Sequence, residues 1–593
     1  MPGLFGIINL RSSYDNEESL GEVFNKINFS QRIMFIGNNY RLVAVKNSRQ
    51  FACHENNRIF LLYEGVFLNY KGNEKGVAQR LHEKYLHEGE KFVKDLRGSF
   101  QIFIIDANSS ETKYLLYCDH TASRQIFYSI TNDRFLFSPD IELLVTNTID
   151  RTMDKTSMVH FMIVGHFPSG HTAIKEIKVL GPGEYLILKG KILAKYQYFH
   201  FKLEPDEKID KRFAIKKLDA VLTKKILEHW RHADDPAILL SGGYDSQFIF
   251  YTIANSVSNT GKLTTVTWGQ NPRRLYADMS VARRIAARFK TKHIEILKTL
   301  DQWRAEYDQM FIAQNGMTDS CFYHAHELTV CKNLRDRYGI RSIFRGDECL
   351  GYGPEAFSLQ SALIANSMSL PEFIPGLSEL FFEEHHIIID HYSSFIYDLV
   401  NNYQSKSYDC LKDELDFYER QHMNRNPLNY YKLHFVDVFC PLLDPDVLNL
   451  FSKLPAKFRS HKMLFKELLK SKFNSQLEIA QYTNLTNWGR EISRSIELKK
   501  FFVQEFAFLP SFLNCEFFSD LTLSLIHNRT KDIKFYIKNF ASPLKHIPVI
   551  DKAWKLFTHK SSSADLTLNI PPQMLIMRAA VLARWNKLWI KNN

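Results

Sequence analysis

The chain has 593 residues, of which 45% are hydrophobic, which predicts more than one domain and excludes a chain that is disordered by composition. A formal net charge of +11 over this length is a weak indication of an anionic partner. The sequence has eight scattered cysteines without a Cys-x-x-Cys pair, no secretory leader pattern and no apolar run of about 18 residues, so we expect a cytoplasmic protein with reduced thiols and no membrane partner.

The first two hundred residues alternate short apolar runs with Gly, Asn, Asp or Ser, a pattern typical of β-strands. The strands expected first are Ile59–Tyr63, Ser99–Ile105, Lys113–Tyr117 and Gln125–Tyr128. Apolar residues at helical spacing predict one helix over Gly76–Tyr85. Gly183 ends a turn before a hairpin of Glu184–Leu188 and Ile192–Tyr198, and the polar segment Glu204–Lys211 predicts a linker.

After the linker, helical stretches alternate with short buried strands. The strands expected here are Ala237–Leu240, Thr264–Trp268 and Arg341–Phe344. This alternation predicts a parallel α/β sheet. From about residue 355 onward the pattern is mostly helical.

A phosphate-binding loop is predicted where the first of these strands ends. Leu240 closes the strand, Gly242 and Gly243 allow a tight turn, and a helical pattern begins near Gln247. Backbone N–H groups at such a helix start bind anions. The hydroxyls of Ser241 and Ser246 add donors, and Asp245, which would repel bare phosphate, suits the magnesium that accompanies ATP.

The segment Ser-Gly-Gly-Tyr-Asp-Ser resembles the pyrophosphate loop of the N-type ATP pyrophosphatases, which adenylate a substrate and release pyrophosphate. Three later segments resemble the asparagine-synthetase branch of that group, in the branch's order: Gly346 to Tyr352, Val436 to Asp444, and His461 to Glu467. The resemblance implies that ATP and Mg²⁺ are bound, with the metal on Asp245 and Asp347. It also implies a catalytic Lys462 that neutralises developing charge.

Two further nucleotide contacts follow from the same resemblance. Trp268, at the end of the second strand, lies where the family contacts adenine, and either stacks on the base or packs in the core. Arg345 and Gly346 open a second loop that is shorter than the family's, and Arg345 is placed to reach phosphate. No base for the attacking amine can be assigned from the sequence.

The N-terminal half resembles the family's glutaminase domain from Lys94 to Asp106 and around Gly181 to Tyr185. It departs at the catalytic positions. Pro2 stands where the family has its cysteine nucleophile, Glu64 where an asparagine donates to the oxyanion, and Val66 where a glutamate binds the ammonium group of glutamine. We therefore predict that this domain does not hydrolyse glutamine.

The expected fold class is an N-terminal nucleophile-hydrolase-like α+β sandwich followed by an α/β N-type ATP pyrophosphatase domain with a helical C-terminal extension. The expected domains are a degenerate class II amidotransferase-like domain over residues 1–203 and a synthetase-like domain over 211–593, whose helical extension starts at about 470.

These features predict a ligase that adenylates a carboxylate and lets an amine form an amide, with macrolactam or other specialised-metabolite synthesis favoured. The expected partners are a small molecule or peptide carrying both groups, and a precursor peptide or partner enzyme, without nucleic acid. The alternatives are asparagine synthesis from free ammonia, amidation of a polysaccharide sugar acid, a tRNA-modifying pyrophosphatase and a nucleotide-binding pseudoenzyme.

Overall fold

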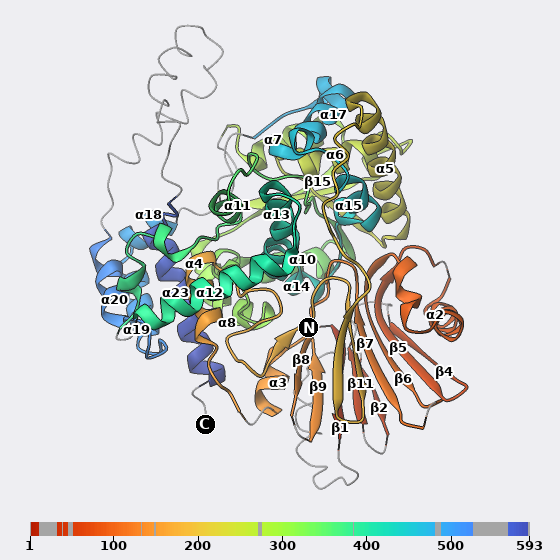
Figure 1. Cartoon of the computed structure of the whole chain (residues 1–593). Coiled ribbons are helices and arrows are strands. Elements are labelled where there is room, and N and C mark those ends of the chain that lie inside the picture. The colour runs from red at the N-terminus through yellow and green to blue at the C-terminus, as the bar shows by residue number, and fades with distance from the viewer. Residues whose placement is uncertain are drawn as a thin grey trace.

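The computed structural model describes residues 2–10, 32–37, 40–45, 51–70, 72–108, 110–131, 133–147, 150–270, 275–382, 385–480, 488–525 and 567–590. Figure 1 shows antiparallel sheets from the N-terminal residues beside an α/β unit, with a group of helices flanking both. Within the described ranges, every helix is too short or too polar to span a bilayer.

Two six-stranded antiparallel sheets form the N-terminal part. The first has the order β10-β8-β9-β1-β3-β2 and the second the order β12-β11-β7-β6-β5-β4. The first contains β1 (Gly3–Asn9), β2 (Arg32–Ile36), β3 (Tyr40–Val45), β8 (Phe127–Ile130), β9 (Arg134–Ser138) and β10 (Lys178–Val179). The second contains β4 (Phe51–Asn56), β5 (Ile59–Phe67), β6 (Gly98–Asp106), β7 (Lys113–Cys118), β11 (Glu184–Lys189) and β12 (Ile192–Gln197).

The two sheets pack face to face through alternate apolar residues, as the period of a strand dictates. Phe103 of β6 stacks on Phe137 of β9 with ring centroids 5.0 Å apart. The predicted antiparallel sandwich is therefore present, and its last hairpin is β11–β12.

One expected helix and one expected strand illustrate how local chemistry sets the ends of elements. The helix is α2 (Glu74–Glu88), which begins after Asn73 because the Asn73 side chain accepts a hydrogen bond from the Gly76 N–H at 2.9 Å. The prediction of a strand starting at Gln125 was wrong by two residues. The Gln125 carbonyl instead accepts a hydrogen bond from the Gln101 side chain at 2.8 Å, so β8 begins at Phe127.

A five-stranded parallel sheet forms the centre of the second half, in the order β15-β14-β13-β16-β17. Its strands are β13 (Pro236–Leu239), β14 (Thr264–Gly269), β15 (Lys292–Leu297), β16 (Ser342–Phe344) and β17 (Asp437–Phe439). The chain passes outward from β13 to β15 and then returns to the other side of β13. The strand order reverses between β13 and β16, and ligands of such sheets bind at the carboxyl ends of the strands at this point.

Helices cover both faces of this sheet, because its strands are apolar on both sides. In chain order the helices of this half are α5 (Lys211–His232), α6 (Tyr244–Ala254), α7 (Asp278–Arg288), α8 (Leu300–Ala313), α9 (Ser320–Tyr323), α10 (Leu328–Asp336), α11 (Leu359–Ala365), α12 (His385–Tyr403), α13 (Tyr408–Leu415), the π-helix η6 (Asp416–Arg425), α14 (Pro427–Leu433), α15 (Pro445–Phe451), α16 (Ala456–Arg459) and α17 (Met463–Phe473).

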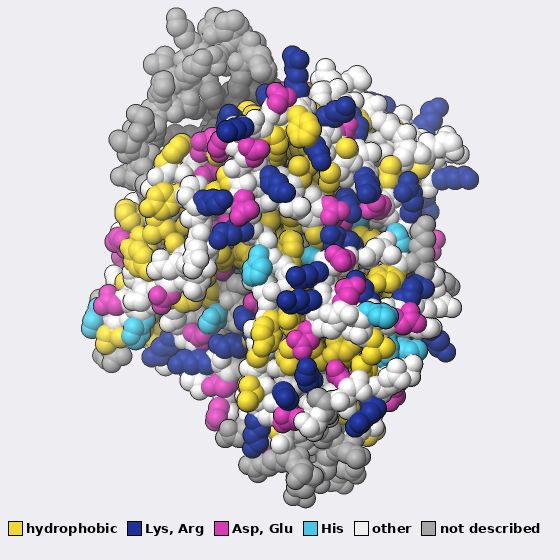
Figure 2. All heavy atoms as spheres, turned by 45° about the vertical axis from the view of Figure 1, so that its right-hand side comes forward, with side chains coloured by type: hydrophobic (Ala, Val, Ile, Leu, Met, Phe, Trp, Pro, Cys, Tyr) yellow, Lys and Arg dark blue, Asp and Glu magenta, His cyan; other side chains and the backbone are white. Residues whose placement is uncertain are grey.

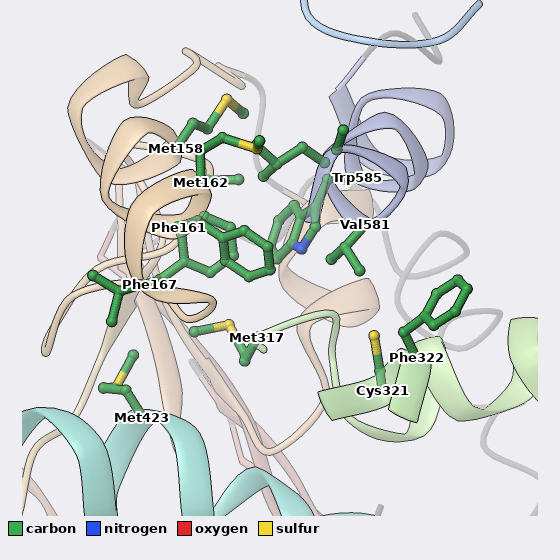
Figure 3. Close-up of a cluster of buried hydrophobic side chains, with 14 of the residues drawn as sticks. Met158, Phe161, Met162, Phe167, Met317, Cys321, Phe322, Met423, Val581 and Trp585 are labelled. Carbon is green, nitrogen blue, oxygen red and sulfur yellow. The ribbon is translucent and has the colours of Figure 1, made fainter. Parts of the chain in front are cut away.

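The last described α-helix, α23 (Pro572–Trp585), packs on α4 (Lys155–Val164) in a core shared by the two halves of the chain. Figure 3 shows Trp585 of α23 facing Phe161 and Phe167, and the Trp585 and Phe167 ring centroids are 5.4 Å apart. The other helices of this region are α3 (Ile141–Asn147), α18 (Trp488–Arg494), α19 (Ile496–Phe506) and α20 (Cys515–Ser524).

Candidate active site

The predicted phosphate loop connects β13 to α6. The hydroxyls of Ser241 and Ser246 lie 2.9 Å apart, and the Gly243 N–H donates to the Ser241 hydroxyl at 3.1 Å. The Gly242 N–H donates to the Asp278 carboxylate at 3.0 Å. A carboxylate thus already uses one donor of this loop, as expected for backbone that can bind an anion.

The second loop follows β16 and touches the first. A Cβ added to Gly346 would lie 2.8 Å from the Cβ of Asp245, so only glycine allows this approach. The contact brings Asp347 to the same hollow as Asp245. The Asp347 carboxylate pairs with Arg345 at 3.0 Å and accepts a hydrogen bond from the Asn429 side chain at 3.0 Å.

Lys462 comes to this place on strained backbone. Both His461 (φ 53°) and Lys462 (φ 56°) are left-handed, a conformation that costs a non-glycine residue about 1–3 kcal/mol and that clusters at functional sites. The Lys462 N–H donates to the Gly351 carbonyl at 3.0 Å. Its ammonium lies 2.9 Å from Asp245 Oδ2 and 2.5 Å from Glu348 Oε1.

The carboxylates and the lysine change each other's ionisation. Burial, with the adjacent Glu348 carboxylate, raises the pKa of Asp245 to about 6, although the Lys462 ammonium opposes this shift. Burial lowers the pKa of Lys462, but Glu348 and Asp245 outweigh it, so the net shift is upward. Lys462 is therefore a fixed positive charge at neutral pH.

These elements surround a cavity of about 390 Å³ at the carboxyl ends of the strands. Two of the predicted site residues do not line it: Gly242 packs against Ala480, and Lys462 lies behind Asp245. The predicted site residues that do line it are Leu240, Ser241, Gly243, Asp245, Ser246, Trp268, Arg345, Gly346 and Asp347. The structure thus brings the predicted nucleotide and metal residues together, while their roles remain predictions.

A buried charge cluster that also lines this cavity was not predicted. The Glu327 carboxylate accepts hydrogen bonds from the Lys298 ammonium at 2.9 Å and from the Tyr431 hydroxyl. It also lies 2.8 Å from His324 Nδ1. Lys432 donates to the Tyr431 hydroxyl at 2.6 Å. These residues come from three distant segments, and the one available signal was Lys298, a charged residue directly after a strand of a parallel sheet.

Lys432 is the member of this cluster whose ionisation is most unusual. Burial, reinforced by the Arg345 guanidinium, lowers the pKa of Lys432 to about 7, whereas Glu327 opposes the shift. An amine with a pKa near neutral can accept a proton as a general base. Lys432 lines the same cavity as Asp245 and Asp347.

Two of the N-terminal positions that depart from the glutaminase pattern, Glu64 and Val66, lie at the boundary with the half that contains the parallel sheet. Glu64 is 3% exposed and pairs with Arg124, whose other nitrogen lies 3.5 Å from Asp437 on β17. Burial raises the pKa of Glu64 to about 7, against the pull of Arg124. Val66 and Arg124 line a narrow cavity of about 60 Å³ here. The ion pairs of Arg124 with Glu64 and Asp437 thus lie at the boundary between the two halves.

Comparison with known proteins gives two family matches. A glutamine amidotransferase domain matches residues 40–199, and an asparagine synthase domain matches residues 217–328. The second match includes the Ser241–Ser246 loop and Trp268, and it ends before Gly346 and Lys462. No curated protein matches the sequence.

Two solved structures are similar over half of the chain. One is described as the allosteric regulatory enzyme of purine biosynthesis, with 11% identity, 50% of this chain and 74% of that chain covered, and a TM-score of 0.20. The other is glutamine phosphoribosylpyrophosphate amidotransferase from B. subtilis, with 12% identity, 50% and 75% covered, and a TM-score of 0.21.

Proposed function

This chain belongs to the asparagine synthetase-like proteins, and from that premise we propose that it is a ligase that adenylates a carboxylate with ATP and joins it to an amine. The observation that carries the proposal is the meeting of Asp245, Gly346 and Lys462 at the point where the strand order reverses. A phosphate-type loop and two carboxylates share one cavity wall there, with the Lys462 ammonium behind Asp245, which suits ATP with its metal.

Asp245 and Asp347 would hold Mg²⁺, because carboxylate oxygens are its preferred protein ligands and both side chains line the cavity. The ion would supply positive charge beside the phosphates of ATP. Asp245 is held by Lys462, and Asp347 by Arg345 and Asn429, so both carboxylates are oriented by neighbours.

In the first step the substrate carboxylate oxygen bonds to the α-phosphorus of ATP, and the bond to pyrophosphate breaks. The donors of the Ser241–Ser246 loop bind the departing pyrophosphate. Lys462, fixed behind Asp245, stabilises the negative charge that builds up. Trp268 and Arg345 line the same cavity and suit contacts with the nucleotide.

In the second step the amine nitrogen bonds to the acyl carbon, AMP leaves, and the amine loses a proton. We assign that proton to Lys432, because its pKa of about 7 makes it a base at neutral pH and it lines the cavity. The hydrogen bond between Lys432 and Tyr431 holds its position.

The nitrogen does not come from glutamine in this proposal. Pro2 has no thiol, and Glu64, paired with Arg124, offers an acceptor where an oxyanion needs a donor. The ion pair from Glu64 through Arg124 to Asp437 also fills the boundary between the two halves. The amine is therefore proposed to belong to the substrate itself, a small molecule or peptide such as a macrolactam precursor in specialised metabolism, presented alone or by a partner enzyme.

Nucleic acid is not the proposed partner. On the face drawn in Figure 2, Lys and Arg side chains are interspersed with Asp and Glu, whereas a phosphate backbone is bound by basic residues gathered along one path.

The nitrogen source can be tested by mass spectrometry. The purified protein is incubated with ATP, Mg²⁺ and candidate peptides that carry both a carboxylate and an amine, in the presence of ¹⁵N-ammonium or amide-¹⁵N-glutamine. The proposal predicts a product lighter than the substrate by one water, with no ¹⁵N. An amide labelled with ¹⁵N from ammonium would contradict the proposal and indicate a ligase that uses free ammonia. An amide labelled from glutamine would contradict the predicted loss of glutaminase activity.

A further inference from the structure

Three buried side chains able to bind a metal ion meet at a place separate from the ATP cavity. They are His160 on α4, His166 just after it, and Glu419 on η6. The ligand atom that each offers lies within 4.8 Å of the other two, and the two imidazole centroids are 5.7 Å apart. None of the three lines the cavity around Asp245.

The two histidines offer nitrogen lone pairs at this place. His166 Nδ1 lies 2.9 Å from the Phe167 carbonyl, so it donates there and leaves Nε2 unprotonated. A hydrogen bond of this kind is what orients a metal-binding histidine. His160 is fully buried, and its Nε2 has no hydrogen-bond partner in the described structure. A buried polar atom without a hydrogen-bond partner destabilises the folded protein by about 1–3 kcal/mol, and a bound metal ion would remove this penalty.

Glu419 brings a negative charge that the described residues do not neutralise. Its two oxygens accept hydrogen bonds from the Ser169 N–H at 2.9 Å and the Tyr403 hydroxyl at 3.0 Å. Among the described residues, no lysine or arginine forms an ion pair with it, although the residue is fully buried. A buried carboxylate without a cation is strongly disfavoured, so this group has either a proton or a metal ion.

A third histidine stands next to these three groups. His422, on η6, lies 3.2 Å through its Nδ1 from the hydroxyl of Ser169, the residue whose N–H binds Glu419. Its Nε2 is buried and has no partner in the described structure. His160 and His422, each with an unpartnered nitrogen in the described structure, therefore lie near one uncompensated carboxylate. Glu419 and His422 both belong to the π-helix η6, and π-helical turns often mark functional sites.

We propose that His160, His166 and Glu419 bind a divalent first-row transition-metal ion, with Zn²⁺ the best match. Two imidazole nitrogens and one carboxylate oxygen are a ligand set of zinc, at bonds of about 2.0–2.2 Å, so the three side chains close in slightly on binding. Three protein ligands leave a fourth position for water.

The ion links two parts of the chain that are far apart in sequence. His160 and His166 lie between β9 and β10 of the antiparallel sheets, and Glu419 belongs to the helices that flank the parallel sheet. Figure 3 shows Phe161 and Met162 of α4, and Met423 of η6, in one apolar core, and Phe161 directly follows His160 in the chain. An ion enclosed by such a core stabilises the joining of the two halves and takes no part in the reaction.

The test begins with the metal content of the full-length protein, purified without chelator and with any affinity tag removed. Inductively coupled plasma mass spectrometry should find one zinc ion per chain in the native protein. Glu419→Gln and His166→Ala should each lose it. His82→Asn, which removes a buried histidine of α2 far from the cluster, should retain it. Equal zinc in the native protein and Glu419→Gln would overturn the proposal.

A second measurement uses only the native protein, so it remains informative if a variant fails to fold. Chelation of the native protein should lower its Tm, and one equivalent of Zn²⁺ should restore it. Co²⁺ added instead should give the visible d–d absorption of a four- or five-coordinate ion. A Tm that neither chelation nor Zn²⁺, Fe²⁺ or Co²⁺ changes would also overturn the proposal. If the native protein contains Fe²⁺ instead of Zn²⁺, the proposed site is supported and its metal is iron.

Discussion

The Lys462 ammonium lies 2.9 Å from Asp245 and 2.5 Å from Glu348, so a single cation joins the two loops that end β13 and β16. The lysine arrives from a third segment, at a left-handed residue that begins α17. Because both carboxylates raise its pKa, Lys462 is positively charged at neutral pH.

Lys462→Met should lower kcat/KM for adenylation by about 10²–10³-fold, the usual effect of removing a group that stabilises transition-state charge. The rate of pyrophosphate release measures it. Lys466→Met is the matched control: Lys466 is one turn further on α17, lies near the Tyr244 ring and lines a different hollow. It should retain activity within a few-fold, and equal losses in the two variants would argue against a specific role for Lys462.

Lys432→Met should abolish amide formation and spare adenylation, because the amine then has no proton acceptor. In the native protein the rate of amide formation should rise with pH through about 7 and then level, as Lys432 loses its proton. The measurement is single-turnover amide formation from pH 6 to 9. An unchanged pH profile in Lys432→Met would remove Lys432 from the mechanism.

Glu64 should make the protein less stable as the pH rises. Its pKa is raised to about 7 in the folded protein, above the ordinary value near 4.5, so the folded state keeps a proton that the unfolded chain releases between these pH values. The Tm of Glu64→Gln relative to the native protein should therefore be higher at pH 8.5 than at pH 5. A pH-independent difference would show that Glu64 stays ionised.

Arg578→Met should destabilise the shared core by about 3–5 kcal/mol, because it leaves a buried carboxylate unpaired. Arg578 pairs with Asp319 at 2.9 Å and donates to the carbonyls of Met162, Ile163 and Val164, which end α4. The expected result is a lower Tm and less soluble protein. Lys587→Met, whose lysine lies 4.2 Å above the Phe508 ring nearby, should have a much smaller effect.

The sequence predicted the centre of the site because its signal is local. The Ser241–Ser246 loop lies between a buried strand and a helix, and that order is visible without a structure. β13, β14 and β16 were found because strands inside a parallel sheet are apolar on both sides. The edge strands β15 and β17 were missed, since β15 alternates Lys, His and Glu with apolar residues and β17 begins with a charged residue, Asp437.

The charge cluster around Glu327 and the histidines around Glu419 could not be predicted in the same way. Lys298, Glu327 and Lys432 come from three distant segments, and no fixed spacing marks them. Their meeting depends on which strand lies beside which, and on how α14 crosses the end of the sheet. The shortened second loop predicted only that Arg345 reaches phosphate, and the structure places Arg345 against Asp347.

The central claim is adenylation at a site built on Asp245, and the products of ATP cleavage test it most directly. The purified protein is incubated with ATP, Mg²⁺ and a panel of carboxylates and peptides, beside Asp245→Asn, and the nucleotides are separated by chromatography. The account predicts AMP and pyrophosphate in equal amounts, dependent on one class of carboxylate and lost in Asp245→Asn. Cleavage to ADP and phosphate, or AMP formation that survives Asp245→Asn, would contradict it.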